Sequence, residues 1–213
     1  MVPPLAALSA KKAAAVMGFR GRTVEMAQRN AGLYGLEGAH FPWETAPNDG
    51  HDAAVAPTDW SEQHISLDVA LGTLATARVL NDSDWNRETA FPVVSNVAAW
   101  LLSRGSWTSK GFEVLHMGGP DETLGQVNNS NFFNLAGMLV LEGALDLAKH
   151  MPPNHVDAAK LKEWEEVYSA MVLPETDGVW NSRPTTILMP TSLSHLTHGR
   201  TRSTDDVTYR YVV

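Results

Sequence analysis

Apolar residues recur at steps of three and four along most of this 213-residue chain. Such spacing places them on one side of an α-helix, whereas a half-buried strand requires strict alternation. No segment shows a comparably strong alternating pattern, so the sequence predicts an all-α fold. The predicted helices cover residues 9–30, 59–77, 87–105, 130–150 and 156–172, with 92 as an alternative start for the third.

The helix over residues 130–150 constrains the architecture further. It is apolar on nearly every side between residues 135 and 141, a pattern that predicts burial all round. The helix over residues 156–172 has an apolar face and a charged face instead. An alternation of buried and half-exposed helices is typical of nested helical hairpins.

Charge and composition exclude several classes of partner. The formal net charge is −8 and the sequence contains no basic run, which argues against nucleic acid and against an anionic membrane surface. The longest apolar run, residues 135–141, is far shorter than the roughly 20 residues that span a bilayer. With 44% hydrophobic residues, the chain can nevertheless bury one sizeable core. We expect neither a nucleic-acid nor a membrane partner, and the sequence indicates no oligomeric state.

The chain has no cysteine, which excludes disulfides, thiolate metal sites and cysteine nucleophiles. Its histidines lack the spacing of metal ligands, so no metal site is predicted. The N-terminus lacks the basic region of a secretory signal. Together these features favour a cytoplasmic location.

The segment HMGGPDETLGQVNNSNFFN over residues 116–134 places Glu122 in a glycine-bounded loop that asparagines follow. A general acid must hold a proton near neutral pH, and neutral amides around it can bind sugar hydroxyls without lowering its pKa. The asparagines that could do so are Asn128, Asn129, Asn131 and Asn134. Taken alone, residues 119–122 more often form an ordinary helix start, with proline first and acids in the first turn.

Further candidate sugar contacts lie upstream. Trp43 can stack on a pyranose face, and the adjacent Glu44 can bind its hydroxyls. The alternative is that Phe41 to Trp43 anchor a loop in the core and Glu44 caps an element. His64 and Asp68 lie at the edge of a predicted helix stripe, where a buried histidine paired with a carboxylate is as consistent with a structural role as with binding.

Three motifs resemble those of one family. The segment over residues 116–134 resembles the GPDE(Y)…V(D/N)NN motif of glycoside hydrolase family 65. GLEGAHFPWETA at residues 35–46 resembles that family's G-x-x-GA-x-FPWE(S/T)A block, and EQHISLD at residues 62–68 is similar to its E-x-H-I-x-x-D helix start. The resemblance extends from about residue 5 to residue 181 and then stops.

The resemblance implies part of an (α/α)6 barrel, the toroid of six helical hairpins, of which the predicted helices make roughly half. We expect residues 1–181 to form a partial catalytic barrel and residues 182–213 a divergent, disordered tail. We also expect the chain to be a truncated enzyme that is inactive alone. Because the loops over residues 42–58 and 116–129 both precede helices of one barrel half, we expect Trp43 and Glu122 to face a common cavity.

For the chemistry, the resemblance implies inversion at an α-glucosidic bond with Glu122 as general acid. The sugar-binding residues that it implies are Trp43, Glu44, His64, Asp68, Asp121, Asn128 and Asn129. No cofactor is implied, and inorganic phosphate is a co-substrate only for the family's phosphorylases. The family's second catalytic glutamate and its phosphate-binding loop lie downstream of the acid motif, beyond residue 213.

The sequence VNNS at residues 127–130 is closer to that of eukaryotic family hydrolases that remove glucose from glucosylgalactosyl-hydroxylysine than to that of the phosphorylases. We therefore expect hydrolysis of a glucosyl disaccharide unit of that kind or of a trehalose-like substrate. A disaccharide phosphorylase and a non-catalytic helical fragment or sugar-binding remnant remain the alternatives. Thr123 and Leu124 stand where the family has tyrosine and histidine, which removes an aromatic ring and an imidazole from beside the proton donor.

Overall fold

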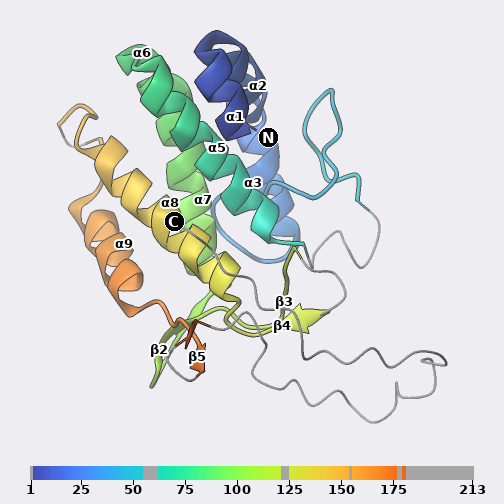
Figure 1. Ribbon diagram of the computed structural model, residues 1–213, viewed down its shortest axis with the longest axis vertical. Helices are drawn as coiled ribbons and strands as arrows, with labels where there is room; N and C mark the ends of the chain where they lie inside the picture. The colour runs from blue at the N-terminus through green and yellow to red at the C-terminus, as the bar shows by residue number, and fades with distance from the viewer. Residues whose placement is uncertain (1, 55–61, 121–124, 154, 177–178, 181–213) are drawn as a thin grey trace.

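A computed structural model of the chain describes residues 2–54, 62–120, 125–153, 155–176 and 179–180. Helices dominate this part of the chain, which confirms the all-α class (Figure 1). The helices are α1 Val2–Leu8, α2 Ala10–Arg22, α3 Val24–Leu33, α5 His64–Leu80, α6 Ser83–Trp85, the π-helical turn η1 Asn86–Ala90, α7 Phe91–Arg104, α8 Asn131–Ala148 and α9 Ala158–Ala170. The tail predicted over residues 182–213 and the predicted helix cap Asp59 lie outside the described residues.

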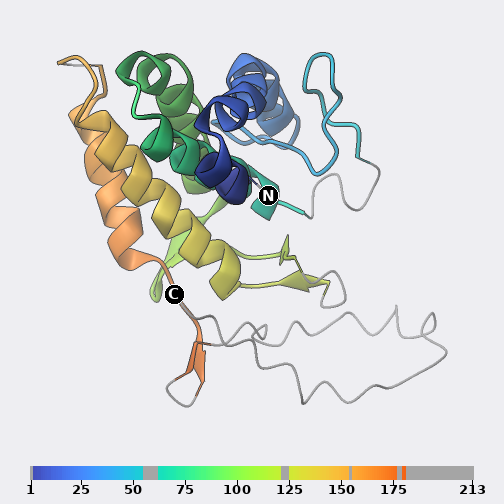
Figure 2. The same ribbon diagram turned by 45° about the horizontal axis from the view of Figure 1, so that its top comes forward.

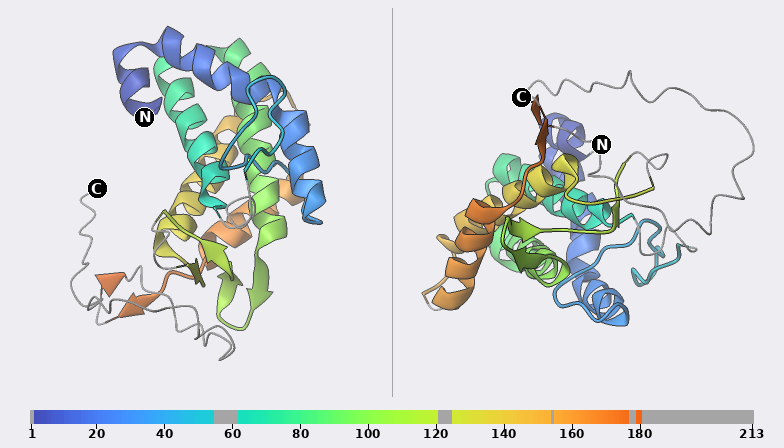
Figure 3. Two further views of the ribbon diagram at one scale, coloured as in Figure 1. Left: turned by 90° about the vertical axis from the view of Figure 1, so that its right-hand side faces the viewer. Right: turned by 90° about the horizontal axis from the view of Figure 1, so that it is seen from below.

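Helices α5, α7 and α8 form the centre of the fold. Helix α5 packs against α1, α2, α7 and α8, while α8 also packs against α7 and α9. Figure 2 shows α9 lying along α8 at one side of these three helices, with α2 and α3 at the opposite side of the molecule. Helices α5 and α8 run in the same direction, and their N-terminal ends lie at the end of the molecule that carries the short strands (Figures 1 and 3).

The core fills the space between these three helices. Its fully buried side chains include Trp100, Leu101, Leu67, Phe133 and Leu141. The prediction that α8 is buried all round is wrong on one side, because Leu139 is 52% exposed. Helices α5, α7 and α9 cover the other sides of α8 and leave this one uncovered among the described residues.

The predicted helix over residues 9–30 is divided in the structure. Ser9 caps α2 as predicted, since its side chain accepts a hydrogen bond from the Lys12 amide at 3.4 Å. At Thr23 the chain breaks between α2 and α3, and the Thr23 hydroxyl donates back to the carbonyls of Phe19 (3.1 Å) and Arg20 (3.3 Å). Side-chain hydrogen bonds of this kind compete with the helical ladder, which is why apolar spacing alone did not show the break.

Three short antiparallel hairpins were not predicted. They pair β1 Ser106–Thr108 with β2 Gly111–Glu113, β3 Met117–Gly118 with β4 Gln126–Val127, and β5 Glu175–Thr176 with β6 Val179–Trp180. Each strand is two or three residues long. Strands this short cannot show an alternating pattern, so the sequence carried no signal for them.

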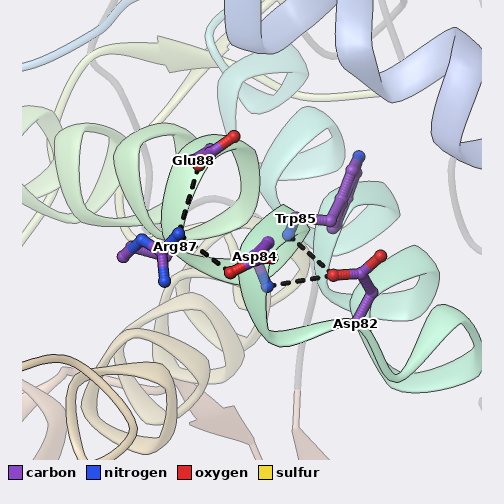
Figure 4. Close-up of polar contacts among 5 residues, drawn as sticks. All are labelled: Asp82, Asp84, Trp85, Arg87 and Glu88. Atoms are coloured by element: carbon purple, nitrogen blue, oxygen red, sulfur yellow. Dashed lines mark hydrogen bonds and ion pairs between the residues drawn. The ribbon is translucent and has the colours of Figure 1, made fainter.

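Exposed polar contacts shape the connection between α5 and α7, at the end of the helices opposite the hairpins. The Asp82 carboxylate caps α6 by accepting from the amides of Asp84 (2.9 Å) and Trp85 (3.0 Å) (Figure 4). Arg87 pairs with Asp84 at 2.9 Å and Glu88 at 3.2 Å. Exposed pairs contribute little to stability, so their main effect is to define the turn between the two helices.

The motif at residues 35–46 packs directly onto α7 through a glycine. Gly38 has a φ of +72°, and a Cβ atom at this position would lie 2.2 Å from the Trp100 nitrogen and 2.3 Å from the Asn96 oxygen. The neighbouring Ala39 amide donates to the same Asn96 carbonyl at 2.9 Å. Only glycine allows this segment to approach the helix backbone so closely.

We predict that Gly38→Ala lowers the free energy of unfolding by about 3 kcal/mol or more, because it combines backbone strain with overlap against a rigid helix backbone. Gly35→Ala is the matched control, since Gly35 has a similar φ of +70° but a Cβ atom added there would meet no atom within 4 Å. Strain alone should cost about 1 to 2 kcal/mol there. Urea denaturation of the 213-residue chain measures both, and equal losses would contradict the packing argument.

Candidate active site

Three segments that are far apart in the sequence meet at the N-terminal ends of α5 and α8. The Ser66 hydroxyl accepts from the Phe41 amide at 3.0 Å and donates to the Phe41 carbonyl at 3.3 Å. The centroid of the Trp43 ring lies 6.0 Å from the centroid of the His64 ring. The centroid of the Phe132 ring lies 5.9 Å from that of His64. All three resembling motifs therefore contribute side chains to one cluster: Trp43, His64 and Phe132.

Trp43 is 42% exposed, whereas Phe41 is 1% exposed. Phe41 is thus the residue that anchors the loop in the core, and Trp43 presents part of its ring to solvent. The loop is held from the other side by Arg20, whose Nη1 donates to the Thr45 hydroxyl at 2.8 Å. Glu44 is exposed, and its backbone carbonyl accepts from the Ala53 amide at 2.9 Å.

His64 is 4% exposed at the start of α5 and lies between two carboxylates. Its Nδ1 is 3.3 Å from an oxygen of Glu62, and its Nε2 is 3.8 Å from an oxygen of Asp68. Burial lowers the pKa of His64 to about 4, so the ring is neutral near pH 7 and neither contact is an ion pair. Burial also raises the pKa of Asp68. A neutral imidazole can donate through one nitrogen and accept through the other, which suits a sugar hydroxyl.

Asn128 and Asn129 hold together the two arms of the hairpin formed by β3 and β4, which we call the acid hairpin: its arms are residues 114–118 and 125–129. The Asn128 side-chain oxygen accepts from the His116 amide at 2.9 Å, and that of Asn129 accepts from the Val114 amide at 2.9 Å. The Asn129 amide group also donates to the Glu113 carboxylate at 2.7 Å. Hydrogen bonds from Thr108 and Asn129 lower the pKa of Glu113, against the opposite effect of burial. Asn129 therefore uses both ends of its side chain within the protein.

Next to this hairpin, Asn131 and Asn134 bind the segment that follows α9. The Asn131 amide donates to the Pro174 carbonyl at 2.8 Å, and the Asn134 amide donates to the Val172 carbonyl at 2.6 Å. These contacts give the four asparagines structural partners that their residue type alone did not reveal. Sugar contacts from Asn128 and Asn129 stay a prediction.

Asp121 and Glu122 lie outside the described residues. The structure describes both strands that lead to them, with Met117 paired to Val127 and Gly118 to Gln126. The predicted common cavity of Trp43 and Glu122 thus stays a prediction. Within residues 2–54, 62–120, 125–153 and the shorter ranges after them, no group of three or more acidic or histidine side chains could hold a metal ion.

Comparison with known proteins decides the family. Residues 1–185 match the glycosyl hydrolase family 65 central catalytic domain. The chain belongs to glycoside hydrolase family 65. Family 65 membership confirms the resemblance drawn from the three motifs.

Two curated relatives carry glucosidase-type names. The protein-glucosylgalactosylhydroxylysine glucosidase of Gallus gallus is 31% identical over 215 residues, covering 94% of this chain and 30% of that protein. The kojibiose hydrolase of Flavobacterium johnsoniae is 29% identical over 136 residues, covering 63% of this chain and 20% of that protein. The chain thus spans between a fifth and a third of the length of these relatives.

A solved structure confirms the fold. A putative kojibiose phosphorylase from the human microbiome superposes with a TM-score of 0.74 at 18% identity, covering 82% of this chain and 25% of the other. This likeness, with the helical architecture, places the chain as part of an (α/α)6 barrel. No helix among the described residues has both the length and the apolar character that crossing a membrane requires.

The buried His64 makes stability depend on pH. Its pKa in the folded state, about 4, lies below the ordinary value of 6.5, so the unfolded chain binds more protons between these pH values. We predict that this histidine lowers the free energy of unfolding by roughly 2 to 3 kcal/mol as the pH drops from 7 to 4.5. The raised pKa of Asp68 acts in the opposite direction.

Urea denaturation at pH 7 and pH 4.5 measures this dependence in the parent chain and in His64→Gln, which should lose less stability on acidification. His150→Gln, at an exposed histidine, is the matched control and should behave like the parent. Equal losses of unfolding free energy in His64→Gln and the parent between the two pH values would show that His64 is not the source of the pH dependence.

Proposed function

We propose that this chain supplies the general acid and part of the sugar-binding wall of an inverting α-glucosidase. Glu122 protonates the leaving oxygen of the glycosidic bond. Trp43 stacks on a glucosyl ring, while His64 and Asp68 bind its hydroxyls. Glu44, Asp121 and the amides of Asn128 and Asn129 complete the contacts of the carbohydrate substrate.

The convergence of the three motifs at one end of the fold is the main support for this function. Trp43 and Phe132 both contact the ring of His64, although these two residues lie 89 positions apart in the sequence. An exposed indole beside a buried neutral imidazole combines a flat apolar face with directed hydrogen bonding, which is what a pyranose requires. The structural contacts of Asn128 and Asn129 add a second role, since they fix the backbone of Val114 and His116 just before β3, the strand that precedes Glu122 in the sequence.

The reaction that we propose is hydrolysis rather than phosphorolysis. The sequence VNNS at residues 127–130 supports this choice. A relative named as a protein-glucosylgalactosylhydroxylysine glucosidase, which matches 94% of the chain, supports it as well. The proposed substrate is a glucosyl disaccharide unit of this kind or a trehalose-like α-glucoside. Water then replaces phosphate as the nucleophile, and no cofactor takes part. We propose a cytoplasmic location.

We predict that Glu122→Gln, in the full-length gene product, lowers kcat on kojibiose, trehalose or glucosylgalactosyl-hydroxylysine by about a hundredfold to ten-thousandfold, because proton donation is worth that much. Glucose release is measured with and without inorganic phosphate. We expect glucose in both conditions, whereas glucose-1-phosphate formed only with phosphate would establish the phosphorylase alternative.

Two controls make the assignment specific to the acid. Glu163→Gln, at an exposed position on α9, should retain parental activity. The Glu122→Gln variant should still cleave α-glucosyl fluoride, whose leaving group needs no strong proton donor. Equal turnover of a natural disaccharide by Glu122→Gln and the parent would remove Glu122 as the acid, and the absence of activity on any α-glucoside would favour a non-catalytic chain.

A further inference from the structure

Arg104, the last residue of α7, binds two parts of the candidate site at once. Its Nε donates to the side-chain oxygen of Gln63 at 2.5 Å. Its Nη2 donates to the carbonyl of Leu115 at 2.6 Å and to that of His116 at 3.0 Å. The guanidinium therefore joins the beginning of α5 to the chain that enters β3.

Both ends of this bridge adjoin residues of the proposed function. Gln63 directly precedes His64 and is the N-cap residue of α5. Leu115 and His116 directly precede β3, the strand that leads to the loop containing Glu122 in the sequence. One side chain thus fixes the spacing between the sugar-binding end of α5 and the arm of the acid hairpin.

His116 gives this contact its directional effect. Its φ of +54° is a conformation that residues other than glycine rarely adopt, and it sets the direction in which the chain enters β3. The Asn128 side chain binds the amide of His116 at 2.9 Å, while Arg104 binds its carbonyl at 3.0 Å. Backbone strain of this kind persists only where surrounding contacts determine it.

An arginine suits this role because its planar fork of N–H donors can reach several acceptors in fixed directions. Burial lowers the pKa of Arg104, but a guanidinium keeps its charge at any physiological pH. A lysine has one terminal nitrogen and cannot reproduce bonds from both Nε and Nη2 to separate acceptors.

We propose that Arg104 is a positioning residue for the proton-transfer step: it orients the acid hairpin against the start of α5 without contacting the substrate. This inference rests on the proposed function of Glu122. A displacement of the donor by about 1 Å reduces catalysis strongly, whereas a substrate that needs no proton donation is insensitive to it.

The test compares Arg104→Met and Arg104→Lys with the parent in the full-length gene product. On kojibiose, we expect kcat to fall about tenfold to a hundredfold for Arg104→Met and less for Arg104→Lys. On α-glucosyl fluoride, we expect a loss below about threefold, because no strong acid is needed. Arg78→Met, at an exposed arginine in the last turn of α5, is the matched control and should leave both rates unchanged.

A second measurement does not depend on activity. Hydrogen exchange of the 213-residue chain should show amides of residues 114–118 exchanging about tenfold faster in Arg104→Met, with those of the buried Val140 and Leu141 unchanged. If Arg104→Met does not fold, Arg104→Lys carries both measurements.

Equal losses on the two substrates would overturn the proposal, since Arg104 would then only support the fold, and unchanged rates and exchange would also overturn it. Failure of the proposed function has a different signature: the parent is inactive on both substrates, or Glu122→Gln lowers neither rate. In that case the exchange result still decides whether Arg104 holds the hairpin arm.

Discussion

The hydrogen bonds between Ser66 and the backbone of Phe41 determine where the motif at residues 35–46 lies relative to the helices. Phe41 is fully buried, and both its N–H and its C=O find a partner in one hydroxyl on α5. A buried peptide group without partners is costly, so this pairing fixes the register between the loop and the helix. Trp43, two residues further on, is consequently brought beside His64 at the helix start.

Side-chain contacts to the backbone recur at the acid hairpin. Residues 114–116 lie between β2 and β3 and belong to neither strand, and side chains bind their backbone instead. Asn128 and Asn129 accept from the amides of His116 and Val114, while Arg104 donates to the carbonyls of Leu115 and His116. Polar side chains of this kind give direction to a backbone that regular secondary structure does not hold. The candidate site therefore depends on a rigid helical base together with a few specific polar contacts from α7 and from the residues before α8.

Periodicity predicted the parts of the fold that packing determines. The helices α7, α8 and α9 lie within a few residues of their predicted bounds, because their apolar faces are buried against one another. The break at Thr23 and the hairpins were not predicted, since they depend on side-chain hydrogen bonds and on strands too short to carry a pattern. These elements are decided by tertiary partners, which a single sequence does not display.

For the site, the motifs predicted candidate sugar contacts, and the structure places Trp43, His64 and Phe132 beside one another, while Glu122 lies outside the described residues. His64 was equally consistent with a structural and a binding role, and its ring lies between Trp43 and Phe132 with both edges near carboxylates. Phe132, Ser66 and Arg104 were missed, because an aromatic, a hydroxyl and a basic residue within helices give no signal of their own. Only the spatial proximity of their partners identifies them.

We propose that Trp43, His64 and the acid hairpin form one sugar-binding wall. Its most direct test is a crystal structure of the full-length gene product, carrying Glu122→Gln, with kojibiose bound. We expect a glucosyl ring stacked on Trp43, with His64 or Asp68 in hydrogen-bond contact with its hydroxyls and residue 122 at the glycosidic oxygen. A disaccharide bound away from the N-terminal ends of α5 and α8, with the Trp43 ring contacting no sugar, would contradict it.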